Sequence, residues 1–328
     1  MVRNPRGRPD RLLLMAMLAL VTSSCSIQRM ATRGVADALT RGPDVYSTDD
    51  DPELVREAIP FGLKTLESLL ASLPDHEGLL LASCSGFTQY AVGFVAMDAL
   101  AVPAEEFARA QALRERALGL CLRGRDYGLH GLERRHRGIG AQLQSAPVAA
   151  AAQIGREELP MLYWTAAAWG SAISLGKDRP ELLADVATIR ALMERGLALD
   201  ERYEDGAFHE AMIVLDALPE AMGGSRERAQ RHYDRALELT QGRRASLFVT
   251  WAENVTVPAQ DPAEFSRQLE RALAIDPAAF PKLRLMTLLM QRKARALEAR
   301  RSELFLELDE ATEPSSNAPR HLDLQERP

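Results

Sequence analysis

The chain has 328 residues, of which 46% are hydrophobic, 26% charged and only 5% aromatic, a composition typical of a globular protein rather than a fibrous or disordered one. The formal net charge is −6, and it becomes −9 when residues 1–24, with four Arg and one Asp, are removed. So acidic a chain is poorly suited to bind nucleic acid, which requires Lys and Arg to neutralise phosphates. The apolar share is rich in Ala and Leu, which favours an all-α fold.

Residues 1–24 have the layout of an export signal. Four arginines precede an apolar core at 12–21: Arg3, Arg6, Arg8 and Arg11. The core is ten residues long, too short to cross a bilayer, which needs about 20 residues. A second apolar stretch, near residues 79–100, is interrupted by polar and charged residues, so we expect no membrane-spanning helix in the mature chain.

The apolar core ends at Cys25, and the residues before it read Thr22, Ser23, Ser24. Bacterial lipoprotein signals prefer Leu three residues before the acylated cysteine and Ala or Gly directly before it, so this box departs at two positions. We expect Cys25 to be acylated, with residues 25–48 as a tether; a secretory signal cut near Ser24 is the alternative. Ser26, in place of Asp, favours the outer membrane.

The other two cysteines, Cys84 and Cys121, lie inside apolar helical patterns. In an oxidising compartment they could form a disulfide, or they could be buried free thiols that pack as small hydrophobes. No CxxC, HExxH or paired Cys and His spacing is present. The sequence therefore predicts no metal and no cofactor.

The main domain is expected to span residues 49–310. Asp51 and Pro52 resemble a helix cap and first turn, and this helix should reach Pro74 with a kink at Pro60. Two further helices are predicted at 77–100 and 104–122. A long Gly- and Arg-rich connection is expected at 124–156, where the basic cluster 134–137 either faces solvent or holds an anion. Later helices are predicted at 157–175, 180–199, 206–218, 225–239, 245–254, 262–275 and 278–308, followed by a disordered tail at 311–328.

A weak internal period appears in the later helices. "RGLALDERY", "DRALELTQG" and "ERALAIDPA" place a small residue before Leu at Gly196, Ala236 and Ala272, in steps of 40 and 36 residues. Tetratricopeptide (TPR) repeats have 34, and Ala229, Tyr233 and Ala236 keep the small, aromatic, small spacing of their second helix. The pattern predicts an array of antiparallel helical hairpins that stack as TPR-like units.

Several words in the chain are more specific: "DDDPEL", "SGFTQYA", "LYWTAAAWG" and "GGSRERAQRHYDRALEL". With them, residues 25–305 closely resemble the T-component lipoproteins of tripartite ATP-independent periplasmic (TRAP) transporters, the TatT family. The resemblance implies a TPR-like periplasmic lipoprotein that is tethered by lipid alone. It also implies self-association, as a trimer, and association with the periplasmic solute-binding protein of a TRAP system. The family is proposed to pass small organic ligands and brings no catalytic residues.

Candidate ligand-lining or pore-lining residues concentrate in two of these words: Phe87, Gln89, Tyr90, Tyr163, Trp164 and Trp169. Tyr and Trp present a large apolar body with one polar atom, which suits a passage for organic ligands. Helical arrays also use the same residues to fill gaps between helices. Core packing is therefore the alternative for each of them.

The sequence offers two alternatives to transport. His209 and Glu210, with Glu204 and Asp205 upstream, could be drawn as an acid–base pair. Adjacent helical residues diverge by about 100°, so we expect no enzyme and a hydrogen-bonding role for His209. The other is a TPR-like scaffold lipoprotein in envelope assembly, with no ligand passage.

Overall fold

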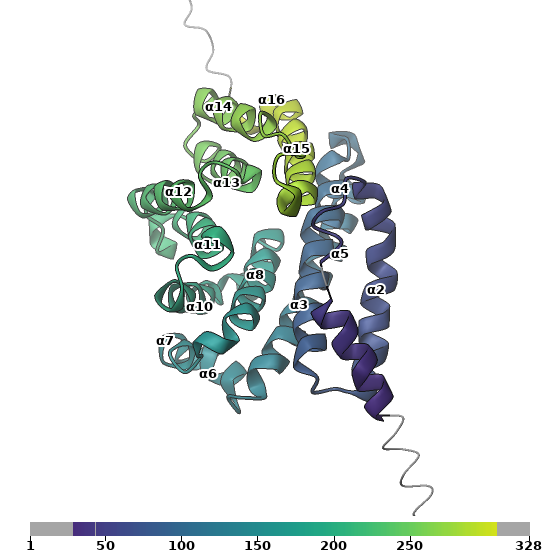
Figure 1. Cartoon of the computed structure of the whole chain (residues 1–328). Coiled ribbons are helices and arrows are strands. Elements are labelled where there is room, and N and C mark those ends of the chain that lie inside the picture. Colours follow the sequence, from purple (N-terminus) through teal and green to yellow (C-terminus); the bar gives the residue numbers. More distant parts are fainter. Residues whose placement is uncertain (1–28, 43, 307–328) are drawn as a thin grey trace, which may run out of the picture.

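The computed structural model describes residues 29–42 and 44–306, and all regular elements in these ranges are helices (Figure 1). This confirms the all-α array. Residues 29–41 are helical. The predicted signal peptide, Cys25 and the predicted tail at 311–328 lie outside the described residues.

The first half of the chain forms long helices packed side by side: α2 (Pro52–Ser72), α3 (Glu77–Tyr90), α4 (Ala96–Ala101), α5 (Phe107–Glu133) and α8 (Leu159–Leu175). Asp51 begins α2 as predicted, because its side chain accepts hydrogen bonds from the backbone N–H groups of Glu53 and Leu54. Pro60 lies inside α2, which continues as one helix to Ser72.

The α3 helix continues through a π-helical turn, Ala91–Val95, into α4. By length and composition alone, Glu77–Ala101 is apolar enough to cross a membrane, but 56% of its most apolar window is buried. Its α3 part packs against α2, α5 and α8. The apolarity of this run therefore reflects its place in the protein core.

The structure corrects the predicted connection at 124–156. Instead of ending near Leu122, α5 continues through Gly124, Gly128 and Gly131 to Glu133. These glycines face neighbouring helices: a Cβ on Gly128 would lie 2.2 Å from Oγ1 of Thr165, on α8. Glycine here permits close helix packing. The rest of the stretch holds two short helices, α6 (Ile139–Ser145) and α7 (Pro147–Ala151).

The basic cluster at the end of α5 is tied to carboxylates of the same chain. Arg135 pairs with Glu157 at 3.2 Å and with Glu77 at 3.4 Å. Nε2 of His136 lies 2.9 Å from Oε2 of Glu158. Half of this cluster therefore fastens the turn after α5 to the segment before α8.

The second half is a run of shorter helices: α9 (Pro180–Leu183), α10 (Val186–Leu199), α11 (Ala207–Asp216), α12 (Arg226–Thr240), α13 (Ala245–Trp251), α14 (Pro262–Leu273), α15 (Arg284–Ala299) and α16 (Arg301–Leu304). Two predicted helices are interrupted: 180–199 divides into α9 and α10, and the last one begins at Arg284 and breaks at Arg300. Consecutive helices pack as hairpins, α10 with α11, α11 with α12, and α14 with α15.

The repeat residues face inward, as the spacing predicts. Ala229, Tyr233 and Ala236 are all buried on α12. The Tyr233 ring lies 4.5 Å from that of Trp251, and its hydroxyl donates to Oε1 of Gln268 at 2.9 Å. The small residues thus let α12 approach its neighbours while Tyr233 fills the space between them.

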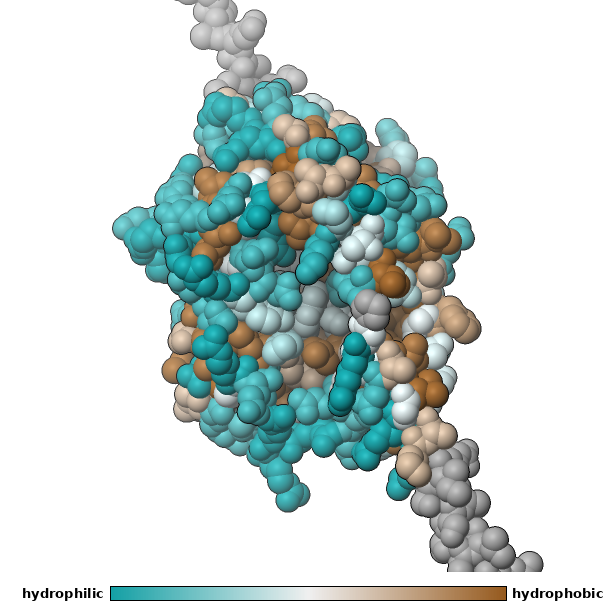
Figure 2. Space-filling view, viewed as in Figure 1, coloured by the Kyte–Doolittle hydropathy of each residue, from teal (hydrophilic) through white to brown (hydrophobic). Residues whose placement is uncertain are grey.

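The array closes on itself, so that α15 lies beside α4 and α2 (Figure 1). Arg292 of α15 pairs with Glu53 of α2 at 2.6 Å, and the N–H of Leu285 donates to the carbonyl of Ser47 at 3.1 Å. In Figure 2 the same view is hollowed near its centre, between α8, α13 and α15. The fold thus arranges helices from both halves of the chain around α8.

Candidate functional site

The α8 helix is apolar on nearly every side, because both halves of the protein pack against it. Pro160 stands in its first turn, where a missing N–H costs nothing. Its buried residues include Leu162 and Ala166, while Tyr163 and Trp164 are half-buried. The helix therefore presents two aromatic side chains with partial access to solvent.

Tyr163 is the centre of an aromatic cluster, which we define as Tyr163, Trp164, Tyr203 and Phe208. The Tyr163 ring lies 5.2 Å from Trp164, 5.4 Å from Tyr203 and 5.2 Å from Phe208. The contacts with Trp164 and Phe208 are edge-to-face, an arrangement that aromatic quadrupoles favour. The cluster joins α8 to α11 and to the turn before it.

A polar group of side chains adjoins the cluster. Glu210 of α11 accepts hydrogen bonds from Ser246 at 3.0 Å and Thr250 at 3.3 Å, both on α13. Nε of Arg244 lies 3.9 Å from Oε2 of Glu210, and the Arg244 guanidinium also donates to the carbonyl of Glu204. The side chains of Arg244 and Glu210 are 16% and 19% exposed. This is a partly desolvated ion pair with a long, weak contact.

Burial and the neighbouring polar side chains together shift the pKa of Tyr163. Burial raises the pKa of Tyr163 to about 12; Arg244 lowers it, while Glu210 and Glu204 raise it further. Burial, with the help of Glu204, also raises the pKa of Tyr203. Both phenols therefore keep their protons at neutral pH and act as hydrogen-bond donors.

Four polar hydrogens at this place have no acceptor among the described residues. They belong to the hydroxyls of Tyr163 and Tyr203, the indole N–H of Trp164 and the buried Nε–H of Arg244. The three aromatic residues are half-buried, so their polar atoms can meet solvent or a ligand. The site thus combines apolar ring surface with a few unpaired donors, as small-molecule sites commonly do.

Of the six residues that the sequence singled out, the structure brings only Tyr163 and Trp164 into this cluster. Phe87 stacks on Tyr127 at 5.9 Å, and Tyr90 lies 6.0 Å from Phe94 in the same core. The other two are Trp169, which is buried and donates its indole N–H to Asp185, and Gln89, which is exposed.

Sequence reasoning missed Tyr203, Phe208 and Arg244 as members of the site, because tertiary packing alone brings them to α8. One signal was present in the sequence, the glycine at position 196. A Cβ added to Gly196 would lie 2.1 Å from the Phe208 ring, so glycine leaves room for that ring. The repeat pattern placed a small residue at 196 without indicating what fills the space beside it.

The residues drawn as an acid–base pair point to different helices. His209 lies 2.8 Å from His232 of α12, whereas Glu210 contacts Ser246 and Thr250 of α13. Among the described residues, no group of three or more His, Cys, Asp or Glu could hold a metal ion. Cys84 and Cys121, the two cysteines in this part of the chain, are buried free thiols, which decides the disulfide question.

Comparison with known proteins identifies the family of the chain. Residues 48–305 match the model of the family described as TRAP transporter T-component. The chain is also 28% identical over 307 residues to an uncharacterized protein of Treponema pallidum (strain Nichols), which covers 88% of this chain and 95% of that protein. That family is an accessory component of transport and not an enzyme family. The chain belongs to the TRAP transporter T-component family.

Proposed function

We propose that this protein binds the periplasmic solute-binding protein of a TRAP uptake system and passes a small organic ligand along the aromatic cluster. The observation that supports ligand passage is the half-buried cluster with four polar hydrogens that lack a protein acceptor. The buried, unpaired Nε–H of Arg244 costs about 1–3 kcal/mol, whereas the donors of the half-buried aromatic residues can meet solvent. A ligand that supplies an acceptor to Arg244 recovers that free energy and can replace solvent at Tyr163 and Trp164, while ring surface contacts its apolar part.

The proposal includes an envelope location. Cys25 carries the lipid, residues 25–48 form the tether, and Ser26 directs the protein to the outer membrane. The protein is periplasmic and self-associated, as a trimer by resemblance to its family. Intact mass of the membrane-extracted protein tests the anchor: a mature chain that begins at Cys25 without added acyl mass contradicts it.

The partner is tested by capture from periplasmic extract with the full mature chain as bait. We expect recovery of an extracytoplasmic solute-binding protein, identified by mass spectrometry. If repeated captures recover none, while the bait retains its helical circular dichroism, the transport assignment fails.

The ligand-passing role is tested by small molecules that co-purify with the protein. Tyr163→Phe combined with Trp164→Phe keeps an aromatic ring at both positions, a smaller one at 164, and removes two unpaired donors, so the retained molecules should be lost or strongly reduced. Phe107→Leu is the control, because Phe107 is 68% exposed and lies on α5, outside the cluster. Equal retention by both variants contradicts the role of the cluster.

A scaffold function without ligand passage is the second candidate. The burial of Phe87, Tyr90 and Trp169 in packing contacts favours it, since these three residues fill the core. A protein that captures envelope-assembly proteins but neither a solute-binding protein nor any small molecule would support the scaffold.

A further inference from the structure

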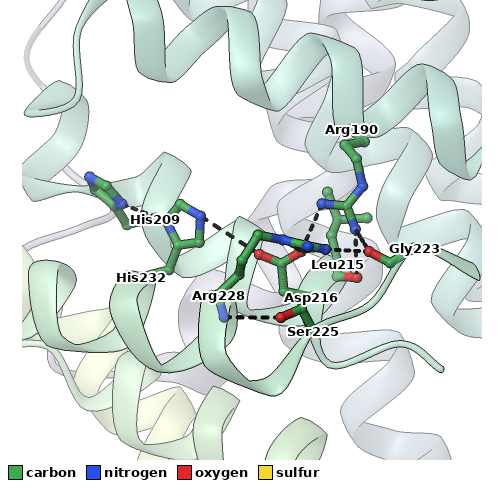
Figure 3. A network of polar contacts seen from close by, with 8 residues as sticks. All are labelled: Arg190, His209, Leu215, Asp216, Gly223, Ser225, Arg228 and His232. Carbon is green, nitrogen blue, oxygen red and sulfur yellow. Dashed lines mark hydrogen bonds and ion pairs between the residues drawn. The ribbon is translucent and has the colours of Figure 1, made fainter. Parts of the chain in front are cut away.

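A buried chain of titratable groups lies between α11 and α12 (Figure 3). Nδ1 of His209 lies 2.8 Å from Nδ1 of His232. At one end, Nε2 of His209 is 3.5 Å from Oε2 of Glu201; at the other, Nε2 of His232 is 3.7 Å from Oδ2 of Asp216. The two imidazole side chains are 10% and 19% exposed. They form one continuous polar contact between the helices.

The buried end of this chain fixes the position of its protons. Asp216 is 1% exposed, and its Oδ1 accepts hydrogen bonds from Arg190 at 2.7 Å and from Arg228 at 3.0 Å. Its Oδ2 has no close hydrogen bond and faces His232, so Nε2 of His232 carries the hydrogen. Nδ1 of neutral His232 is then unprotonated and accepts the hydrogen of His209 Nδ1.

The pair can take one added proton on Nε2 of His209, which faces Glu201 at 3.5 Å, but not a second one. When both rings are protonated, every ring nitrogen carries hydrogen, and two N–H groups then face each other across 2.8 Å. The bond between the helices becomes a repulsion between donors. Protonation of both rings therefore opposes the packing of α11 on α12 at this point.

The His209 side chain is flanked in sequence by two residues of the candidate site. Phe208 packs its ring edge-to-face on Tyr163, and Glu210 binds Ser246 and Thr250 of α13. A helical turn carries all three residues, so a displacement of His209 is transmitted to the aromatic cluster on one side and to Glu210 on the other.

We propose that the His209–His232 pair is an acid-sensitive latch that holds the first turn of α11 in place and, on protonation, loosens the aromatic cluster. The two histidines of the latch lie on α11 and α12; its role as a regulator of ligand passage rests on the proposed function.

Burial, with the charged groups around the pair, determines the direction of its pH response. Burial lowers the pKa of His232 to about 4, helped by His209, Arg231 and Arg190, while Asp216 opposes the shift. Burial also lowers the pKa of His209, against a rise from Glu201, and Arg235 contributes to the lowering. Because the folded pKa lies below the ordinary 6.5, the latch is closed at pH 7 and weakens as the pH falls from about 6.5 towards 4.

Hydrogen exchange of the full mature chain, read by mass spectrometry and corrected for intrinsic rates, tests the latch. From pH 7 to 4.5 we expect protection of peptides covering 207–216 and 226–240 to fall by on the order of a hundredfold, about tenfold for each pH unit below 6.5. The double variant His209→Gln with His232→Gln should lose this response, because two amides form a donor–acceptor bond at any pH. His130→Gln, an exposed histidine paired with Asp75 at 3.2 Å, is the control and should keep it.

An acid response that persists in the double variant, or a wild-type chain with no response in these helices, overturns the latch. If the double variant does not fold, the ring protons of His209 and His232 in the wild-type chain decide the matter by NMR. Neutral rings at pH 5.5 support the latch, and midpoints at or above 6.5 contradict it. Neither measurement uses a ligand or a solute-binding protein, so failure of the latch and failure of the proposed function are separate results.

Discussion

Replacing Gly128 with alanine tests how the centre of the fold is packed. The new Cβ would lie 2.2 Å from Oγ1 of Thr165 and 2.9 Å from Sγ of Cys84, so it meets α8 and α3 together. Thr165 is 0% exposed and its hydroxyl donates to the carbonyl of Met161 at 2.6 Å. A β-branched side chain with a fixed hydroxyl has little freedom to move away.

The expected loss follows from two opposing effects. Overpacking of a dense core costs about 1–3 kcal/mol, whereas alanine improves helix propensity over glycine by about 1 kcal/mol. Gly128→Ala should therefore lower the free energy of unfolding by up to about 2 kcal/mol. Gly119→Ala is a matched control on the same helix, α5, because a Cβ there meets nothing within 4 Å. The control should gain about 0.5–1 kcal/mol.

Urea titration followed by circular dichroism at 222 nm measures both variants against the wild-type chain. Thermal midpoints should move in the same directions, by about 2–4 °C per kcal/mol. If Gly128→Ala is as stable as Gly119→Ala, the close approach of α3, α5 and α8 at this glycine is wrong.

Two further predictions concern the buried polar and sulfur groups. Asp216→Asn leaves two guanidinium groups without their shared carboxylate and should lower the free energy of unfolding by about 3 kcal/mol. Glu227→Gln breaks an exposed pair with Arg231 and should cost under about 1 kcal/mol in the same urea titration. Equal losses of stability in the two variants would refute the difference between the buried and the exposed ion pairs. The thiols of Cys84 and Cys121 should resist maleimide in the native protein at pH 8 and react in denaturant without reductant, because burial raises the pKa of each to about 12. Peptide mapping of the label checks this, and rapid native labelling contradicts it.

The sequence was sufficient for the class of fold and for most helices, because their caps and apolar periods are local signals. Asp51 before Pro52 begins α2, and Asp261 before Pro262 begins α14, each with a side-chain bond to the backbone. The inward spacing of Ala229, Tyr233 and Ala236 was also readable, since helical periodicity assigns a face directly.

The connection predicted at 124–156 shows where local reading fails. Glycine was taken as a helix breaker, but Gly124, Gly128 and Gly131 recur at helical spacing and face α3 and α8. Their function is to let neighbouring helices approach, which depends on partners far away in sequence. The spacing of four and three residues was the available signal.

The candidate site was recoverable only in part for the same reason. Tyr163 and Trp164 were found because they lie together on one helix, whereas Tyr203, Phe208 and Arg244 reach them through tertiary packing. The role of His209 in hydrogen bonding was foreseen, but its partner, His232, is on the next helix.

The central claim is that this family member passes ligand at the aromatic cluster. The most direct measurement is transfer of small molecules from the partner solute-binding protein, purified with its natural contents, to the purified mature chain, followed by mass spectrometry of each protein after separation. The account predicts that the wild-type chain and Phe107→Leu acquire the molecule, and that the variant with Tyr163→Phe and Trp164→Phe does not. Equal transfer to all three proteins, or no transfer to the wild-type chain, would contradict it.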